Sequence, residues 1–181
     1  TAQMHPAIRV MKTIKPAKLT EPRPGAFVFD LGANVAGWAR IHVEGPAGTR
    51  VKMRYGERLF MNGTLDQRHI RSLVYQGQFQ TDTYILKGGG VETWEPRFVY
   101  HGFQYVEVTG WPGKPSLESL DGRVIHTAFE PAGSFACSNE MFNRLVELMD
   151  NSYRANFQGI PTDCPQREKN GWLGDGQLAA E

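Results

Sequence analysis

The sequence has little of what marks disulfide-rich or metal-binding proteins. It contains only two cysteines, Cys137 and Cys164, with no CxxC pattern, and its five histidines are scattered singly. A disulfide framework or a zinc site needs such residues grouped at short spacing, so both are disfavoured. We therefore expect no metal site.

An excess of one charge and long apolar runs are missing as well. The 20 basic residues balance 19 acidic ones, and no run of Lys and Arg is long enough to attract nucleic acid. No stretch of about eighteen apolar residues occurs, as a membrane span would need, and residues 1–20 lack the apolar centre of a signal peptide. We expect neither nucleic acid nor a membrane as a partner, and the compartment is not indicated.

What the chain does contain is a long β-type pattern. Residues 1–26 carry four prolines and are predicted to form an N-terminal strand and linker. From residue 27 to residue 132, apolar and polar residues alternate, for example in 51–55 and 103–108. Turn sequences separate these runs, namely Gly45-Pro46-Ala47-Gly48, Asn62-Gly63, Gly88-Gly89-Gly90 and Gly110-Trp111-Pro112-Gly113. The pattern predicts a mainly β fold, an antiparallel β-sandwich or jelly roll.

The spacing of the apolar residues changes after Gly133 from strand-like alternation to a helical period, and residues 133–181 are predicted to be helical in part. Ser138 can cap a helix whose apolar positions recur at intervals of three and four, which places them on one face. These positions are Met141, Phe142, Leu145, Leu148, Met149 and Tyr153. A second helix is expected to begin at Gly174-Asp175. It has too few residues before Glu181 to bury an apolar side, so we expect the chain to be a piece of a longer one.

The thirteen residues 163–175 are the most informative stretch. They read Asp-Cys-Pro-Gln-Arg-Glu-Lys-Asn-Gly-Trp-Leu-Gly-Asp and hold three carboxylates, an arginine and a tryptophan. Carboxylates accept hydrogen bonds from hydroxyl groups, arginine orients carboxylates, and an indole stacks on the apolar face of a sugar ring. The composition is therefore suited to a polar, sugar-sized ligand.

This motif resembles the catalytic motif of bacterial α-L-rhamnosidases, glycoside hydrolase family 78. Residues 29–38, 81–88 and 94–108 are similar to signatures of the β-sandwich that precedes the catalytic domain in that family. The resemblance implies that residues 27–132 form this sandwich and that residues 133–181 open an (α/α)6 barrel, which would remain incomplete here. It implies an inverting hydrolase that releases terminal α-linked L-rhamnose without a cofactor.

The resemblance also assigns roles to single residues. Glu168 corresponds to the general acid, while the family's general base has no counterpart in this chain. Asp163, Arg167, Trp172 and Asp175 would bind substrate or support the acid.

Each of these residues also has an ordinary structural explanation. Residues 167–169 without their flanking motif would be a solvated charge run, and Arg167 a structural ion pair. Asp163 would form an Asx turn and Asp175 a helix cap. Trp172 would belong to the core.

Two functions of different classes follow. The first is a segment of an inverting α-L-rhamnosidase that is inactive alone, because it lacks the general base and most of the barrel. Its partners would be a rhamnose-containing carbohydrate and the remainder of its own catalytic domain. The alternative is a non-catalytic carbohydrate-binding or scaffolding β-sandwich, in which exposed aromatic residues stack on sugars. These aromatics would come from Trp38, Tyr75, Trp94, Tyr100 and Trp111, although most of them are expected to fill the core or an interface.

Overall fold

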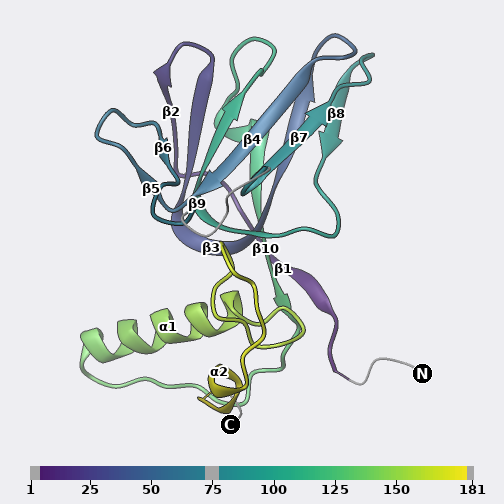
Figure 1. Ribbon diagram of the computed structural model, residues 1–181. Helices are drawn as coiled ribbons and strands as arrows, with labels where there is room; N and C mark the ends of the chain where they lie inside the picture. The colour runs from purple at the N-terminus through teal and green to yellow at the C-terminus, as the bar shows by residue number, and fades with distance from the viewer. Residues whose placement is uncertain (1–4, 72–77, 179–181) are drawn as a thin grey trace.

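The chain folds into an antiparallel β-domain followed by one long helix, a loop and a short helix (Figure 1). The computed structural model describes residues 5–71 and 78–178; the side chains of Leu173, Asp175 and Leu178 lie outside the described part. The elements are β1 (Ile8–Ile14), β2 (Lys18–Arg23), β3 (Ala26–Glu44), β4 (Arg50–Gly56), β5 (Arg58–Leu59), β6 (Leu65–Asp66), β7 (Thr81–Ile85), β8 (Val91–Trp94), β9 (His101–Thr109), the 3-10 turn η1 (Leu117–Ser119), β10 (Leu120–Thr127), α1 (Glu140–Ala155) and α2 (Leu173–Leu178).

All strand pairs are antiparallel, which confirms the predicted fold class. The main sheet has the order β1-β10-β3-β9-β4-β7, and β2 and β8 also pair with β3. The strands β5 and β6 form a separate hairpin whose turn contains Asn62-Gly63, as predicted. Gly63 has a φ of 81°, a value that glycine adopts without steric cost.

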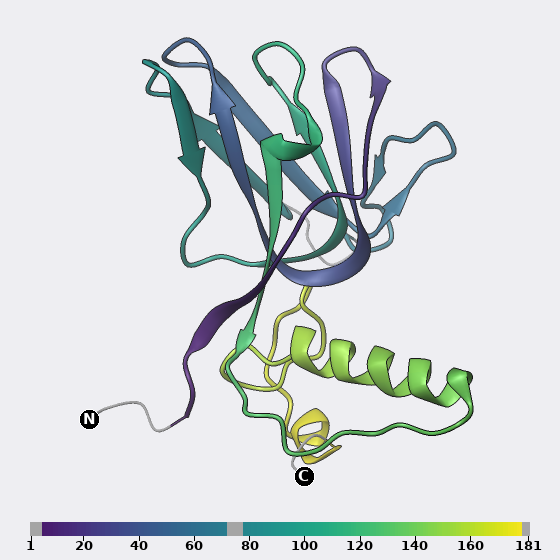
Figure 2. The same ribbon diagram turned by 180° about the vertical axis from the view of Figure 1, so that it is seen from behind.

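A bend in β3 allows the strands of the single main sheet to surround the core. The first part of β3 pairs with β2 and β9, whereas its last part pairs with β10 and β8. Between the two parts, residues 31–34 of β3 stand opposite the single residue Gln104 of β9. Such an irregularity turns the strand sharply, and the curved ribbon of β3 is visible at the lower end of the β-domain in Figures 1 and 2.

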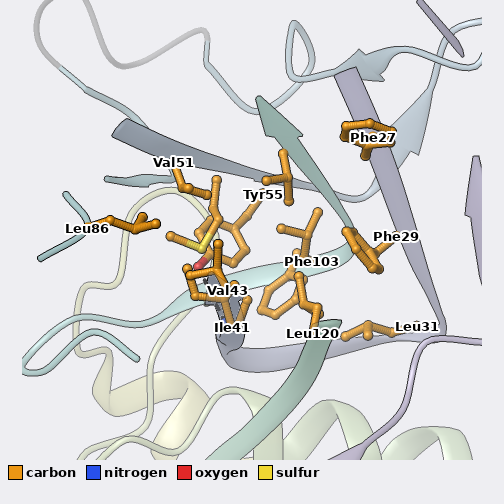
Figure 3. Packing of buried hydrophobic residues seen from close by; sticks show 14 residues of the cluster. Phe27, Phe29, Leu31, Ile41, Val43, Val51, Tyr55, Leu86, Phe103 and Leu120 are labelled. Atoms are coloured by element: carbon orange, nitrogen blue, oxygen red, sulfur yellow. Dashed lines mark hydrogen bonds between the residues drawn. The ribbon is translucent and has the colours of Figure 1, made fainter. Parts of the chain in front are cut away.

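Every second residue of the central strands fills the core (Figure 3). In β4, the alternation expected from the sequence is confirmed, because Val51, Met53 and Tyr55 are fully buried. The first part of β3 contributes Phe27 and Phe29 in the same way. The core is completed by Leu31, Ala39, Ile41, Val43, Leu86, Phe103, Val106, Val108 and Leu120.

The helix α1 lies beyond the lower end of the β-domain (Figure 2). Its predicted cap was wrong by one residue: the N-cap is Asn139, whose side-chain oxygen accepts a hydrogen bond from the Met141 N–H at 3.0 Å. Both residue types are good caps, and Asn139 is the one whose side chain reaches the free N–H.

The apolar face of α1 is not buried. No residue of the helix is buried, and Met141, Leu145 and Met149 are among the large apolar residues left at least half exposed. Exposed apolar surface in one stripe marks an interaction site. Among the described residues, no helix is long and apolar enough to cross a bilayer.

Candidate active site

The motif lies in a loop that returns from α1 to the lower end of the β-domain. After α1 the chain is tied to the end of β10, because Thr127 donates from N–H and hydroxyl to the Phe157 carbonyl at 3.0 and 3.1 Å. Isolated bridges join Phe157 to Pro161 and Thr162 to Gly171, so the loop closes on itself. The loop, drawn in yellow, reaches up to the bend of β3 (Figure 1).

Asp163 lies at the centre of this loop. Its carboxylate accepts hydrogen bonds from the N–H groups of Cys164 and Asn170 at 2.8 and 3.2 Å. Burial by itself would raise the pKa of Asp163, but hydrogen bonds from Glu168, from these two N–H groups and from the Trp172 indole outweigh it and lower the pKa. Asp163 is thus an ionised acceptor in the middle of the motif.

Glu168 is held from three sides. Its carboxyl group lies within 4.8 Å of that of Asp163 and accepts a hydrogen bond from the Arg167 guanidinium at 2.7 Å. Its backbone N–H donates to the sulfur of Cys164 at 3.3 Å. About a quarter of the Glu168 side chain stays exposed, 28 %. Arg167 therefore forms an ion pair with its neighbour Glu168.

Trp172 is 53 % exposed, so it is not a core residue of this chain. Its N–H nevertheless contributes to the site through the hydrogen bond to Asp163. The helix α2 begins at Leu173, one residue earlier than expected, and Asp175 therefore lies inside the helix and not at its N-cap. The Asp175 side chain lies outside the described part of the chain.

The motif rests directly on the start of β9. Lys169 donates from its ammonium to the Tyr100 carbonyl at 2.5 Å and lies 4.5 Å from the centre of the Tyr100 ring. A side chain at Gly102 would meet the motif, because a Cβ there would lie 2.9 Å from the Gln166 Cβ and 3.0 Å from a ring carbon of Pro165. Glycine is thus required at this close approach.

A buried polar network lies beneath this contact. The Tyr55 hydroxyl donates to Asp82 at 2.8 Å, and the His101 ring lies 3.0 Å from the same oxygen and stacks on Tyr55 at 4.1 Å. Burial lowers the pKa of His101, with the nearby Lys169 charge acting in the same direction and Asp82 opposing it. Burial and the Asp82 charge raise the pKa of Tyr55.

Sequence reasoning missed the residues of the β-domain that support the motif. His101 and Gly102 were noted only as part of a family-like segment, and Tyr100 was considered besides only as an aromatic residue that could stack on a sugar or fill an interface. A usable signal was present: a glycine inside an otherwise alternating strand marks a close approach of another backbone.

The one group of three potential metal ligands among the described residues is Asp163, Cys164 and Glu168, whose ligand atoms lie within 4.8 Å of one another. Each of these side chains already has a hydrogen-bond partner inside the loop. The geometry therefore does not require an ion.

Most of the aromatic residues named as possible sugar-stacking groups already have packing or hydrogen-bond partners in the β-domain. Trp94 and Trp111 pack against the core, and the Trp38 indole N–H donates to Glu95 at 2.8 Å. Tyr100 lies under Lys169, and Tyr75 lies outside the described residues. Most of these rings thus serve the core or an interface, as expected.

Comparison with known proteins matches both parts of the chain. Residues 20–126 match the model of the bacterial alpha-L-rhamnosidase concanavalin-like domain, and residues 130–181 match the bacterial alpha-L-rhamnosidase 6 hairpin glycosidase domain. A concanavalin-like β-domain that leads into a helical hairpin domain defines the class, that of the glycosidases. Within this class, the chain belongs to the bacterial α-L-rhamnosidase family.

Individual relatives support this family assignment. An alpha-L-rhamnosidase of Streptomyces avermitilis is 47 % identical over 175 residues, which are 96 % of this chain and 16 % of the relative. The structure of the α-L-rhamnosidase from Dictyoglumus thermophilum superposes with a TM-score of 0.92 at 45 % identity, covering 99 % of this chain and 20 % of that one. A crystal structure of the Streptomyces avermitilis enzyme complexed with L-rhamnose gives a TM-score of 0.90 at 46 % identity, covering 99 % and 17 %. The chain thus spans about a sixth to a fifth of the length of these relatives.

Proposed function

We propose that this chain supplies the general acid of an inverting α-L-rhamnosidase and that Glu168 is this acid. The observation that carries the proposal is the close approach of the Glu168 and Asp163 carboxyl groups, whose oxygen atoms lie within 4.8 Å of each other inside the segment that matches the family's glycosidase domain. Hydrogen bonds from the surrounding N–H groups keep Asp163 ionised, so a negative charge stands beside the Glu168 carboxyl group. A carboxyl group that holds a proton is what cleavage of a glycosidic bond requires at the leaving oxygen.

Asp163 is not suited to be the second carboxylate of the reaction. In an inverting glycosidase, acid and base stand about 6.5–9.5 Å apart so that a water molecule fits between them. Asp163 and Glu168 have oxygen atoms within 4.8 Å of each other, which leaves no room for that water. The general base therefore comes from outside this chain.

The other motif residues form the sugar subsite in this proposal. Trp172 offers an exposed indole against which a deoxy sugar can pack with its apolar face. Asp163 has remaining acceptor capacity for a sugar hydroxyl, and Arg167 holds the Glu168 carboxyl in one orientation as well as lining the subsite. Asp175 follows in the next turn of chain and is assigned to the same subsite.

The division of the chain follows from the same proposal. Residues 1–26 are the N-terminal strand and linker, residues 27–132 are the β-sandwich domain, and residues 133–181 are the first part of the helical catalytic barrel. The remainder of that barrel is the partner for the apolar face of α1, which nothing in the described residues covers. The chain alone is expected to be inactive, since the base and the closed pocket are missing.

The substrate is a carbohydrate with terminal α-linked L-rhamnose. Support comes from relatives of 45–47 % identity that are α-L-rhamnosidases, one of them solved with L-rhamnose. No cofactor takes part, because two carboxyl groups suffice for the reaction.

The test is hydrolysis of an aryl α-L-rhamnoside by the full-length protein, with the corresponding aryl glucoside as control. Wild type is expected to cleave the rhamnoside and to leave the glucoside intact. Glu168→Gln should lower kcat by about 10²–10⁴-fold, the usual contribution of a general acid. A Glu168→Gln protein that keeps the wild-type rate would refute the assignment. A full-length protein that never cleaves the rhamnoside would favour a binding module.

A further inference from the structure

We propose that Lys169 is a positioning residue, which fixes the acid Glu168 by anchoring the motif loop on the Tyr100 segment of the β-domain. The inference rests on the proposed role of Glu168 and gives the β-domain a part in catalysis. The hydrogen bond of the Lys169 ammonium group and its contact with an aromatic ring are both to Tyr100.

The anchor consists of two contacts to one residue. The ammonium group donates to the Tyr100 carbonyl at 2.5 Å, and it lies 4.5 Å from the centre of the Tyr100 ring. A cation over an aromatic face gains more when it is shielded from water. The shielding is evident from the lowered pKa of Lys169, which burial causes and which the negative charge of Asp82 opposes only in part. The side chain is therefore held in one place and does not move freely in solvent.

The backbone conformation of Lys169 links this anchor to the position of Glu168. Lys169 has a φ of 58°, a left-handed conformation that costs a residue with a side chain about 1 kcal/mol or more. Its N–H donates to the Cys164 carbonyl at 3.2 Å and so closes the turn that contains Glu168. A strained turn persists only where its surroundings fix it, and the Lys169 side chain provides that restraint.

The opposite side of the turn is fixed by packing. Pro165 and Gln166 lie so close to Gly102 that a Cβ there would be within 2.9–3.0 Å of them. Tyr100 and Gly102 both belong to the segment that opens β9, so the turn rests on one rigid support at two points. Positioning of this kind affects rate steeply, because a displacement of about 1 Å of a catalytic group costs up to about 10²-fold.

The experiment compares two aryl rhamnosides whose leaving groups differ in how much they depend on protonation by the general acid. A 2,4-dinitrophenyl α-L-rhamnoside releases a phenolate that leaves without protonation, whereas a phenyl α-L-rhamnoside needs the acid. In the full-length protein, Lys169→Met should lower kcat on the phenyl substrate by about 10–100-fold, a part of the general-acid contribution. On the dinitrophenyl substrate it should change kcat about threefold or less. Lys169→Arg, which keeps the cation, should restore most of the rate.

The matched control is Lys18→Met, a lysine whose exposed side chain lies on β2; it should leave both rates unchanged. Equal losses on both substrates, or no loss on either, would overturn the proposal. If Lys169→Met does not fold by circular dichroism, Lys169→Gly carries the same test, since glycine accepts the positive φ. Glu168→Gln separates the two proposals: wild-type rates in this variant would show that the role of Glu168 has failed, whatever Lys169 does.

Discussion

The carboxyl groups of Asp163 and Glu168 lie within 4.8 Å of each other at the centre of the motif loop. Backbone N–H groups of Cys164 and Asn170 keep Asp163 as the charged partner. The loop thus places a negative charge next to the residue that is proposed to donate the proton.

Replacing the charged partner should weaken the acid. In Asp163→Asn, an amide oxygen still accepts from Cys164 and Asn170, but the negative charge beside the Glu168 carboxyl group is gone. We expect kcat for the phenyl rhamnoside to fall by about 10²-fold in the full-length protein, with the unfolding temperature changed by only a few degrees. Steady-state kinetics and thermal unfolding measure both quantities, and an unchanged kcat would contradict the expectation.

A methyl group at Gly102 should displace the motif loop. In Gly102→Ala, the new Cβ would lie 2.9 Å from the Gln166 Cβ and 3.0 Å from its backbone nitrogen, so the loop must shift. Overpacking of this kind costs about 1–3 kcal/mol. We expect faster amide hydrogen exchange at Glu168 and Lys169. Gly133→Ala is the control, because a Cβ there meets nothing within 4 Å; equal exchange in both variants would argue against the contact.

Asp121 should make the stability of the β-domain sensitive to acid. It is 1 % exposed and is surrounded by Lys15 at 2.8 Å, Arg40 at 2.5 Å and His42 at 3.1 Å. Burial alone would raise its pKa, but the hydrogen bonds from these three groups hold the pKa well below its usual value. Since the pKa is lower in the folded state, the stabilisation is present above the usual pKa of 3.8 and is lost as the pH falls below it.

Asp121→Asn should therefore lower the free energy of unfolding by about 3 kcal/mol at pH 7, and this difference should shrink below pH 4. Urea denaturation at several pH values measures it. Asp150→Asn serves as control: its exposed pair with Arg154 on α1 should be worth only about 0.5 kcal/mol. A loss of stability in Asp121→Asn that is the same at pH 7 and at pH 3 would show that charge is not the cause.

The helix α1 should be the least protected regular element of the 181-residue chain. None of its residues is buried, whereas β3 and β9 supply much of the core. Helices gain most of their stability from packing, and local opening costs little where contacts are few. We expect the amides of α1 to exchange with deuterium at least about tenfold faster than those of β3, and to become protected in the full-length protein. Equal protection of both elements in the 181-residue chain would contradict this.

Much of the fold could be predicted because it depends on short-range patterns. The alternation in residues 51–55 specified which side of β4 enters the core, and Asn62-Gly63 specified a hairpin turn. The error at the cap of α1 arose because Ser138 and Asn139 are both good caps, and only the backbone path selects between them. Likewise Arg167 pairs with its neighbour Glu168 because the loop turns Asp163 toward backbone N–H groups.

The sequence by itself determined the β-rich architecture, the change to a helical period after Gly133, and the residue types of residues 163–175, because these are properties of neighbouring residues. Only the tertiary structure decided that Tyr100 and Gly102 support the motif. Lys169 is separated from Tyr100 by 69 residues, and contacts over such distances arise from the bend of β3 and the return of the loop after α1. No local pattern encodes them, because they depend on how the whole chain packs.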